Sequence, residues 1–114
     1  MPSDYRKVIS LGTDKELLWL RHAVLRSAGF DVHTADDEKK ALALVRGGPC
    51  GVLLLCYSLP YETRERLSEA FRECCPSNRI VAIANQKVEK PEFADALVYG
   101  VEGPEALIEA LGNP

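Results

Sequence analysis

Residues 51–60 read GVLLLCYSLP, and this short stretch decides the fold class. Its apolar residues, 52–56, form an unbroken run instead of alternating with polar ones. Such a run is typical of a strand covered on both faces, as in a parallel sheet flanked by helices. The run is also much too short to cross a bilayer. Residues 51–57 are therefore predicted to form a buried strand of an α/β domain.

Strand and helix alternate on both sides of this stretch. Four further β-rich runs are predicted as strands, at 7–11, 30–34, 79–84 and 95–99. Amphipathic periodicity and capping residues predict helices over 14–28, from Asp36 or Asp37 to Arg46, over 62–74, and from Pro104 onward.

The periodicity of two helices also predicts which side chains face the core. In the first helix the apolar face consists of Leu17, Leu20, Val24 and Ala28, with Leu18 and Leu25 beside it. In the third helix the core-facing side chains are Leu67, Phe71 and Cys74. Thr13 and Glu16 have the spacing of a capping box, so Thr13 is predicted as the first N-cap, with anion binding as the alternative.

Five strands that alternate with helices imply a parallel sheet with helices on both faces. Right-handed crossovers leave few topologies, of which the flavodoxin-like strand order 2-1-3-4-5 is the leading one. The connection at 85–93 is short, so the fourth helix is predicted to be shortened. We predict one three-layer, doubly wound α/β domain over residues 1–114.

Composition narrows the function classes. The formal net charge is −3, and the basic residues are spread singly among acidic ones, which argues against nucleic-acid binding. The N-terminus has no apolar signal core, so a cytoplasmic protein without membrane contact is predicted.

Four cysteines are present, at positions 50, 56, 74 and 75. Disulfide frameworks belong mainly to secreted chains, and Cys50 and Cys56 would lie about 20 Å apart on one strand. All four thiols are therefore predicted to be reduced. A metal site at Cys50, Cys74 and Cys75 would lack a fourth ligand, so packing is the favoured interpretation and no metal or cofactor is expected.

Three stretches carry a family resemblance. They are KVISLGTDKELLWLRHAVLRSAGFDVHTADDEKKAL at 7–42, GVLLLCYSLP at 51–60 and ADALVYGVEGPEALIEAL at 94–111. In order, length and turn chemistry they resemble the receiver domain of two-component response regulators. The resemblance covers nearly the whole chain and implies a signalling domain that is not an enzyme.

The family's chemistry needs Mg²⁺ and a phosphoacceptor. The resemblance implies that the acidic pair holding Mg²⁺ falls on Gly12 and Thr13, with only the next residue, Asp14, acidic. It implies that the acceptor aspartate falls on Cys56. Mg²⁺ prefers oxygen ligands, carboxylates above all, so Mg²⁺ binding is not expected in this chain.

The other two functional positions depart from the family as well. The resemblance implies that the switch hydroxyl falls on Ala84 and the lysine on Tyr99. Phosphoryl transfer depends on positioning and charge neutralisation, and neither residue supplies charge. We therefore predict a degenerate receiver, a pseudo-receiver, that binds a signalling protein or a second copy of itself without phosphorylation.

Several alternatives stay open. The chain could be a true phosphorelay receiver that uses Asp14 and another carboxylate. Cys56 could be a thiol redox switch, although a small apolar side chain in the aspartate's place is the favoured interpretation. Tyr57, Tyr61 and Tyr99 could form an interaction rim, or they could plug an unused pocket.

Overall fold

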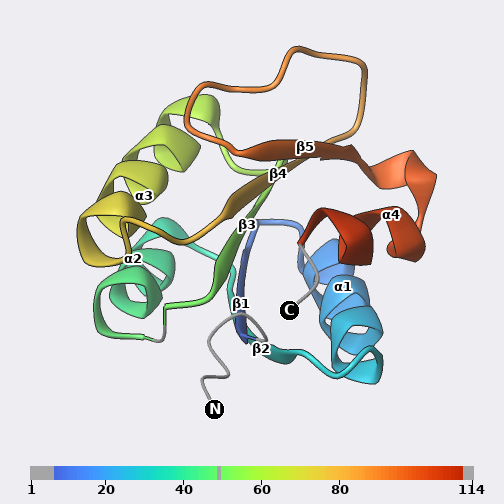
Figure 1. Cartoon of the computed structure of the whole chain (residues 1–114), viewed down its shortest axis with the longest axis horizontal. Helices are drawn as coiled ribbons and strands as arrows, with labels where there is room; N and C mark the ends of the chain where they lie inside the picture. The colour runs from blue at the N-terminus through green and yellow to red at the C-terminus, as the bar shows by residue number, and fades with distance from the viewer. Residues whose placement is uncertain (1–6, 49, 112–114) are drawn as a thin grey trace.

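The strand β3 (Val52–Cys56) lies at the centre of the sheet, and all five of its residues are buried. The computed structural model describes residues 7–48 and 50–111. The sheet is parallel, and its order β2-β1-β3-β4-β5 confirms the predicted topology (Figure 1). The other strands are β1 (Lys7–Leu11), β2 (Asp31–Ala35), β4 (Ile80–Ala84) and β5 (Ala96–Tyr99).

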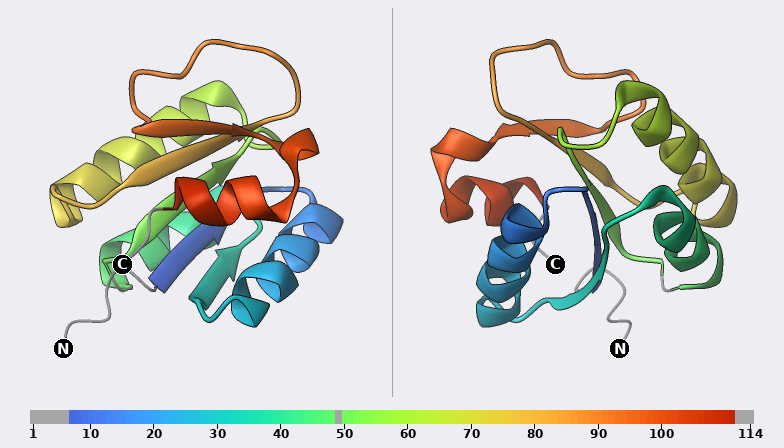
Figure 2. Two further views of the ribbon diagram at one scale, coloured as in Figure 1. Left: turned by 45° about the vertical axis from the view of Figure 1, so that its right-hand side comes forward. Right: turned by 180° about the vertical axis from the view of Figure 1, so that it is seen from behind.

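Helices cover both faces of the sheet, as Figures 1 and 2 show. On one face lie α1 (Lys15–Ser27) and α4 (Pro104–Ala110), and on the other lie α2 (Glu38–Gly47) and α3 (Tyr61–Cys74). A short 3₁₀ helix, η2 (Gly100–Glu102), joins β5 to α4. The sheet has one hydrophobic core on each face, and successive strand residues point to opposite faces. Leu53 therefore packs in the core under α2 and α3, and Leu54 packs in the core under α1 and α4.

The connection between β4 and β5 is less helical than predicted. A shortened helix was predicted there, but residues 85–95 contain no helix, only bends and a turn. Figure 1 shows an open loop beyond β5. Residues 85–90 are all exposed, so this stretch has no apolar face that could hold a helix on the sheet. The helix that would cover this part of the sheet is missing.

The helix α1 corrects two predictions. Its N-cap is Asp14, whose carboxylate Oδ1 accepts from the Leu17 backbone N–H at 3.2 Å, not Thr13. Its buried residues are Leu18 and Leu25, seven apart, whereas Leu20 is 60% exposed and Ala28 is exposed. The helix therefore packs on the sheet through the neighbouring apolar stripe.

The third helix follows the prediction with one exception. Leu67 and Phe71 are fully buried, but Cys74 is exposed at the last turn. The next residue, Cys75, turns inward and is 3% exposed.

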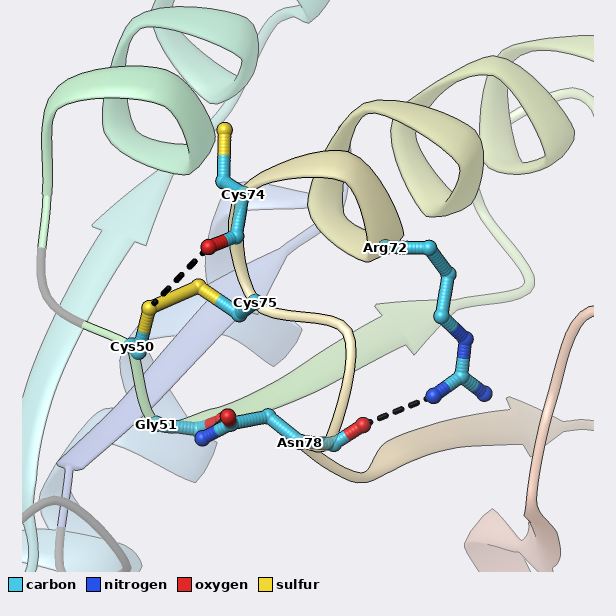
Figure 3. Close-up of a disulfide and its surroundings, with 6 residues drawn as sticks. All are labelled: Cys50, Gly51, Arg72, Cys74, Cys75 and Asn78. Atoms are coloured by element: carbon cyan, nitrogen blue, oxygen red, sulfur yellow. Dashed lines mark hydrogen bonds between the residues drawn. A yellow bond between two sulfur atoms is a disulfide. The ribbon is translucent and has the colours of Figure 1, made fainter.

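A disulfide joins Cys50 to Cys75, so the prediction of four reduced thiols is wrong for these two residues. Their Cα atoms lie 5.7 Å apart, because α3 ends beside the segment that enters β3. Figure 3 shows the bridge between these segments, with the Cys74 sulfur directed away from it. The prediction compared Cys50 only with Cys56 on one strand. Sequence spacing does not reveal that the fold brings Cys50 next to Cys75.

Two ionic contacts reinforce this side of the domain. Arg66 forms a two-point ion pair with Glu38, with Nε–Oε2 at 2.8 Å and Nη2–Oε1 at 2.9 Å, and so joins α3 to α2. Asp95 Oδ2 accepts from the Ile80 backbone N–H at 2.8 Å and from Arg72 Nη2 at 2.9 Å. Asp95 thus connects the starts of β4 and β5 with α3.

None of the helices in the described part of the chain is long and apolar enough for a membrane crossing.

Candidate functional site

The carboxyl ends of β1, β3, β4 and β5 meet at one edge of the sheet, where ligands bind in folds of this kind. Gly12 follows β1, Cys56 ends β3, Ala84 ends β4 and Tyr99 ends β5. The predicted site positions are therefore brought to the same edge. Because β1 and β3 are neighbours, Gly12 and Cys56 are in direct contact there.

Cys56 is an interior residue at this edge. It is 1% exposed, and its sulfur accepts a weak hydrogen bond from the Ser58 backbone N–H at 3.5 Å. Gly12 lies against it so closely that an added Cβ would be 3.0 Å from both the Cys56 Cβ and the Ser58 Oγ. A Cβ at position 12 would therefore require these two side-chain atoms to shift by a few tenths of an ångström.

The two loops that border Cys56 are hydrogen-bonded to each other. The Thr13 backbone N–H donates to Ser58 Oγ at 2.9 Å, and the Thr13 hydroxyl donates to the Ser58 carbonyl oxygen at 2.9 Å. Sequence analysis missed Ser58 as a partner, because no local pattern links residues 45 positions apart. The two bonds thus join the loops that follow β1 and β3 through neutral groups.

Arg64 is a cationic side chain close to Cys56 and Tyr61. Burial lowers the pKa of the Arg64 guanidinium, and the electrostatic influence of Cys56 and Tyr61 partly offsets this effect. Arg64 Nε is buried without a hydrogen-bond partner among the described residues, and the guanidinium carbon lies 5.5 Å from the Tyr61 ring centroid. Arg64 thus packs beside the site but forms no ion pair there.

The three tyrosines of the predicted rim separate into two groups. Tyr57 and Tyr99 line one cavity, between α1 and α4. Tyr61 lies apart from it, with its ring 5.4 Å from that of Phe93 in the β4–β5 connection. The structure therefore brings Tyr57 and Tyr99 together in one cavity and places Tyr61 outside its lining.

The Tyr99 side chain reaches the β4–β5 connection. Its hydroxyl donates to the Val88 carbonyl oxygen at 3.3 Å, across the β4–β5 connection. Its backbone N–H donates to Glu102 Oε1 at 3.0 Å and begins η2. Ala84, one strand away, is buried and offers only a methyl group.

Solved structures share this architecture. The chemotaxis protein CheY4 of Vibrio cholerae is 22% identical, with a TM-score of 0.79 over 92% of this chain and 94% of that chain. The chain has the receiver fold. The receiver domain of Francisella response regulator 1452 is 20% identical, with a TM-score of 0.78 and 92% of each chain covered.

A third solved structure places the receiver fold within a longer protein. It is the N-terminal domain of a response regulator/sensory box/GGDEF three-domain protein from Carboxydothermus hydrogenoformans. It is 17% identical, with a TM-score of 0.76 over 92% of this chain and 90% of that chain. No protein-family model matches the chain, and no curated protein matches its sequence.

The residues at the carboxyl edge do not fit the Mg²⁺ that the receiver family uses. Gly12 has no side chain, Cys56 offers sulfur, and the Thr13 hydroxyl donates its proton to Ser58. Asp14 is the one carboxylate of this set, and it accepts from the first turn of α1. Within residues 7–48 and 50–111, no three His, Cys, Asp or Glu side chains gather in one cluster.

Proposed function

We propose that this chain is a degenerate receiver that signals through protein contacts and does not depend on phosphorylation. The observation that carries the proposal is the carboxyl edge, where Gly12 packs on Cys56 and Thr13 bonds to Ser58. In this account, the receiver fold serves as a scaffold for a binding surface. The domain would then transmit a signal by binding or releasing its partner protein.

The chemistry of phosphoryl transfer supports this proposal. Transfer needs cations that neutralise charge on the moving phosphoryl group, together with an exposed acceptor. At this edge the acceptor position holds a thiol that is 1% exposed. Tyr99, at the position that the resemblance gives to lysine, is uncharged and turned toward Val88.

The proposed partner is a signalling protein or a second copy of the chain, and the proposed location is the cytoplasm. The domain arrangement of the Carboxydothermus protein supports a role beside other signalling domains. No catalytic activity is proposed, because no nucleophile and base are paired among the described residues at the carboxyl edge.

Mass spectrometry tests this proposal. The purified chain is incubated with Mg²⁺ and acetyl phosphate, beside a receiver that retains its acceptor aspartate. We expect the control to gain one phosphoryl group and this chain to keep its mass. A phosphoryl group on a single residue of this chain would contradict the proposal and favour a true phosphorelay receiver that uses Asp14 or another carboxylate.

Burial argues against the alternative of a redox switch at Cys56. A thiol reacts only where a reagent can reach it, and Cys56 is 1% exposed. Cys74 is an exposed free cysteine in the same chain and provides an internal control. We expect iodoacetamide to modify Cys74 quickly and Cys56 only after unfolding. Rapid native alkylation of Cys56 would restore the redox alternative.

A further inference from the structure

A cavity of about 400 Å³ lies between α1, α4 and the carboxyl ends of β4 and β5. Figures 1 and 2 show α1 and α4 side by side on this face of the sheet. Cavities that hold small ligands usually measure about 300–1,000 Å³. The volume is therefore sufficient for a small organic molecule.

Apolar side chains form most of the wall. Leu17, Leu20 and Val24 line it from α1, Val98 lines it from β5, and Leu107 lines it from α4. This is the stripe of α1 that the periodicity assigned to the core and that the sheet does not cover. At the rim, Leu20 is 60% exposed and Val101 is 90% exposed. An apolar ligand would remove this surface from water.

Arg21 is the one charged residue in the described lining of the cavity. Its Nη1 atom is buried and has no hydrogen-bond partner within the described residues. A buried charged donor without a partner is costly, and a carboxylate matches a guanidinium in charge and geometry. The tyrosines at 57 and 99 and Asn85 add polar groups to the same lining.

We propose that this cavity binds a small apolar carboxylic acid. Its hydrocarbon part would pack on Leu17, Val24 and Leu107, and its carboxylate would accept hydrogen bonds from Arg21. The apolar wall favours the hydrocarbon, and the unpaired guanidinium selects an anion over a neutral molecule. This site borders the carboxyl edge and shares Tyr99 with it, but it goes beyond the proposed function, since ligand binding there does not require the loss of phosphoryl chemistry.

Backbone NMR titrations of the whole chain test the site. Octanoate and octan-1-ol share a chain length and differ in charge, and 2-naphthoate distinguishes an aromatic from an aliphatic preference. We expect saturable shifts at residues 98–107 with octanoate or naphthoate, and an octanoate affinity about tenfold or more above that of octanol. The absence of saturable shifts, or shifts confined to other surfaces, would overturn the proposal.

Two variants and a control assign the roles of the residues. Arg21→Met should lower octanoate affinity to that of octanol, while Val24→Trp should fill the cavity and remove binding of both. Arg26→Met changes an exposed arginine in the last turn of the same helix and should leave both affinities unchanged. Thermal melting verifies that each variant folds.

The charge preference of the unmodified chain provides a test that needs no variant. Equal affinities for octanoate and octanol in that chain would overturn the role of Arg21. Concentration-dependent shifts at the same residues without ligand would show that a second copy covers the cavity, and they would also contradict the proposal.

Discussion

The two ends of the sheet are fastened in different ways. At the amino end, a disulfide joins Cys50 to Cys75, and Asp95 bonds to Ile80 and Arg72. At the carboxyl end, Thr13 is hydrogen-bonded to Ser58, Gly12 packs on Cys56, and ion pairs join Asp36 to Lys15 and Lys40. The covalent link thus lies at the end away from the family's site, whereas ion pairs lie at both ends.

The covalent link that should stabilise the fold thus lies at the opposite end of the sheet from the candidate functional site. Receiver chemistry places charged groups at the carboxyl end, where they hold an ion and a phosphoryl group. In this chain the corresponding positions hold small, neutral or buried residues, namely Gly12, Thr13, Cys56, Ala84 and Tyr99. Substitutions at the amino end should therefore destabilise the fold strongly, and substitutions at the carboxyl end only weakly.

The disulfide should have the largest effect. The double substitution Cys50→Ala and Cys75→Ala, or reduction of the bridge, is expected to lower the free energy of unfolding by about 2–4 kcal/mol, because the unfolded chain is released from a closed loop. Urea titration measures this loss. Cys74→Ala, next to the bridge on an exposed residue, should change stability by less than about 0.5 kcal/mol. Equal losses in both variants would refute a stabilising bridge.

Asp95 should come next. Asp95→Ala leaves the Ile80 backbone N–H without its acceptor and should cost about 1–3 kcal/mol in urea titrations. Asp95→Asn keeps an acceptor of similar shape and should cost less. Glu92→Ala, on the exposed turn of the same connection, serves as the control and should have little effect. If Asp95→Ala left the free energy of unfolding unchanged, other contacts would be holding the β4–β5 connection in place.

The Asp95 contribution should also depend on pH. Burial acts to raise the pKa of Asp95, but the hydrogen bond from Ile80 and the hydrogen bond and charge of Arg72 lower it below its usual 3.8. Since the pKa is lower in the folded chain, this stability is complete above the unfolded value and is lost as the pH falls through the folded pKa. The difference in free energy of unfolding between the original chain and Asp95→Ala should therefore decrease below about pH 4. A difference that increases on acidification would contradict the sign of this effect.

The contact between Thr13 and Ser58 should have the smallest effect. Thr13→Val removes the hydroxyl that donates to the Ser58 carbonyl but keeps the shape of the side chain. The bond is exposed to water, so the loss should stay below about 1 kcal/mol. Thr34→Val, at an exposed position on β2, is the matched control. A loss of stability as large as that caused by removing the disulfide would contradict the predicted difference in stability between the two ends of the sheet.

The sequence predicted the sheet well because strands are encoded locally. The unbroken apolar run at 52–56 became β3, and the alternation of elements predicted the order of all five strands. Each crossover has few allowed arrangements, so the order follows once the strands are found. The gathering of Gly12, Cys56, Ala84 and Tyr99 at one edge followed from the same topology.

The contacts that sequence reasoning missed depend on tertiary structure. α1 carries two apolar stripes with helical spacing, and the pattern does not show which one meets the sheet. Leu18 and Leu25 were buried, while Leu17, Leu20 and Val24 came to line the cavity. The Cys50–Cys75 bridge likewise depends on where α3 ends in space.

A Mg²⁺ titration followed by backbone NMR tests the central claim most directly, since every receiver reaction at this edge begins with the ion. The account predicts that millimolar Mg²⁺ shifts the signals of residues 12–14 and 56–58 no more than an equal ionic strength of NaCl does. Saturable shifts at these residues, specific to Mg²⁺, would show that the carboxyl end holds the ion, and would contradict a receiver that works without phosphorylation.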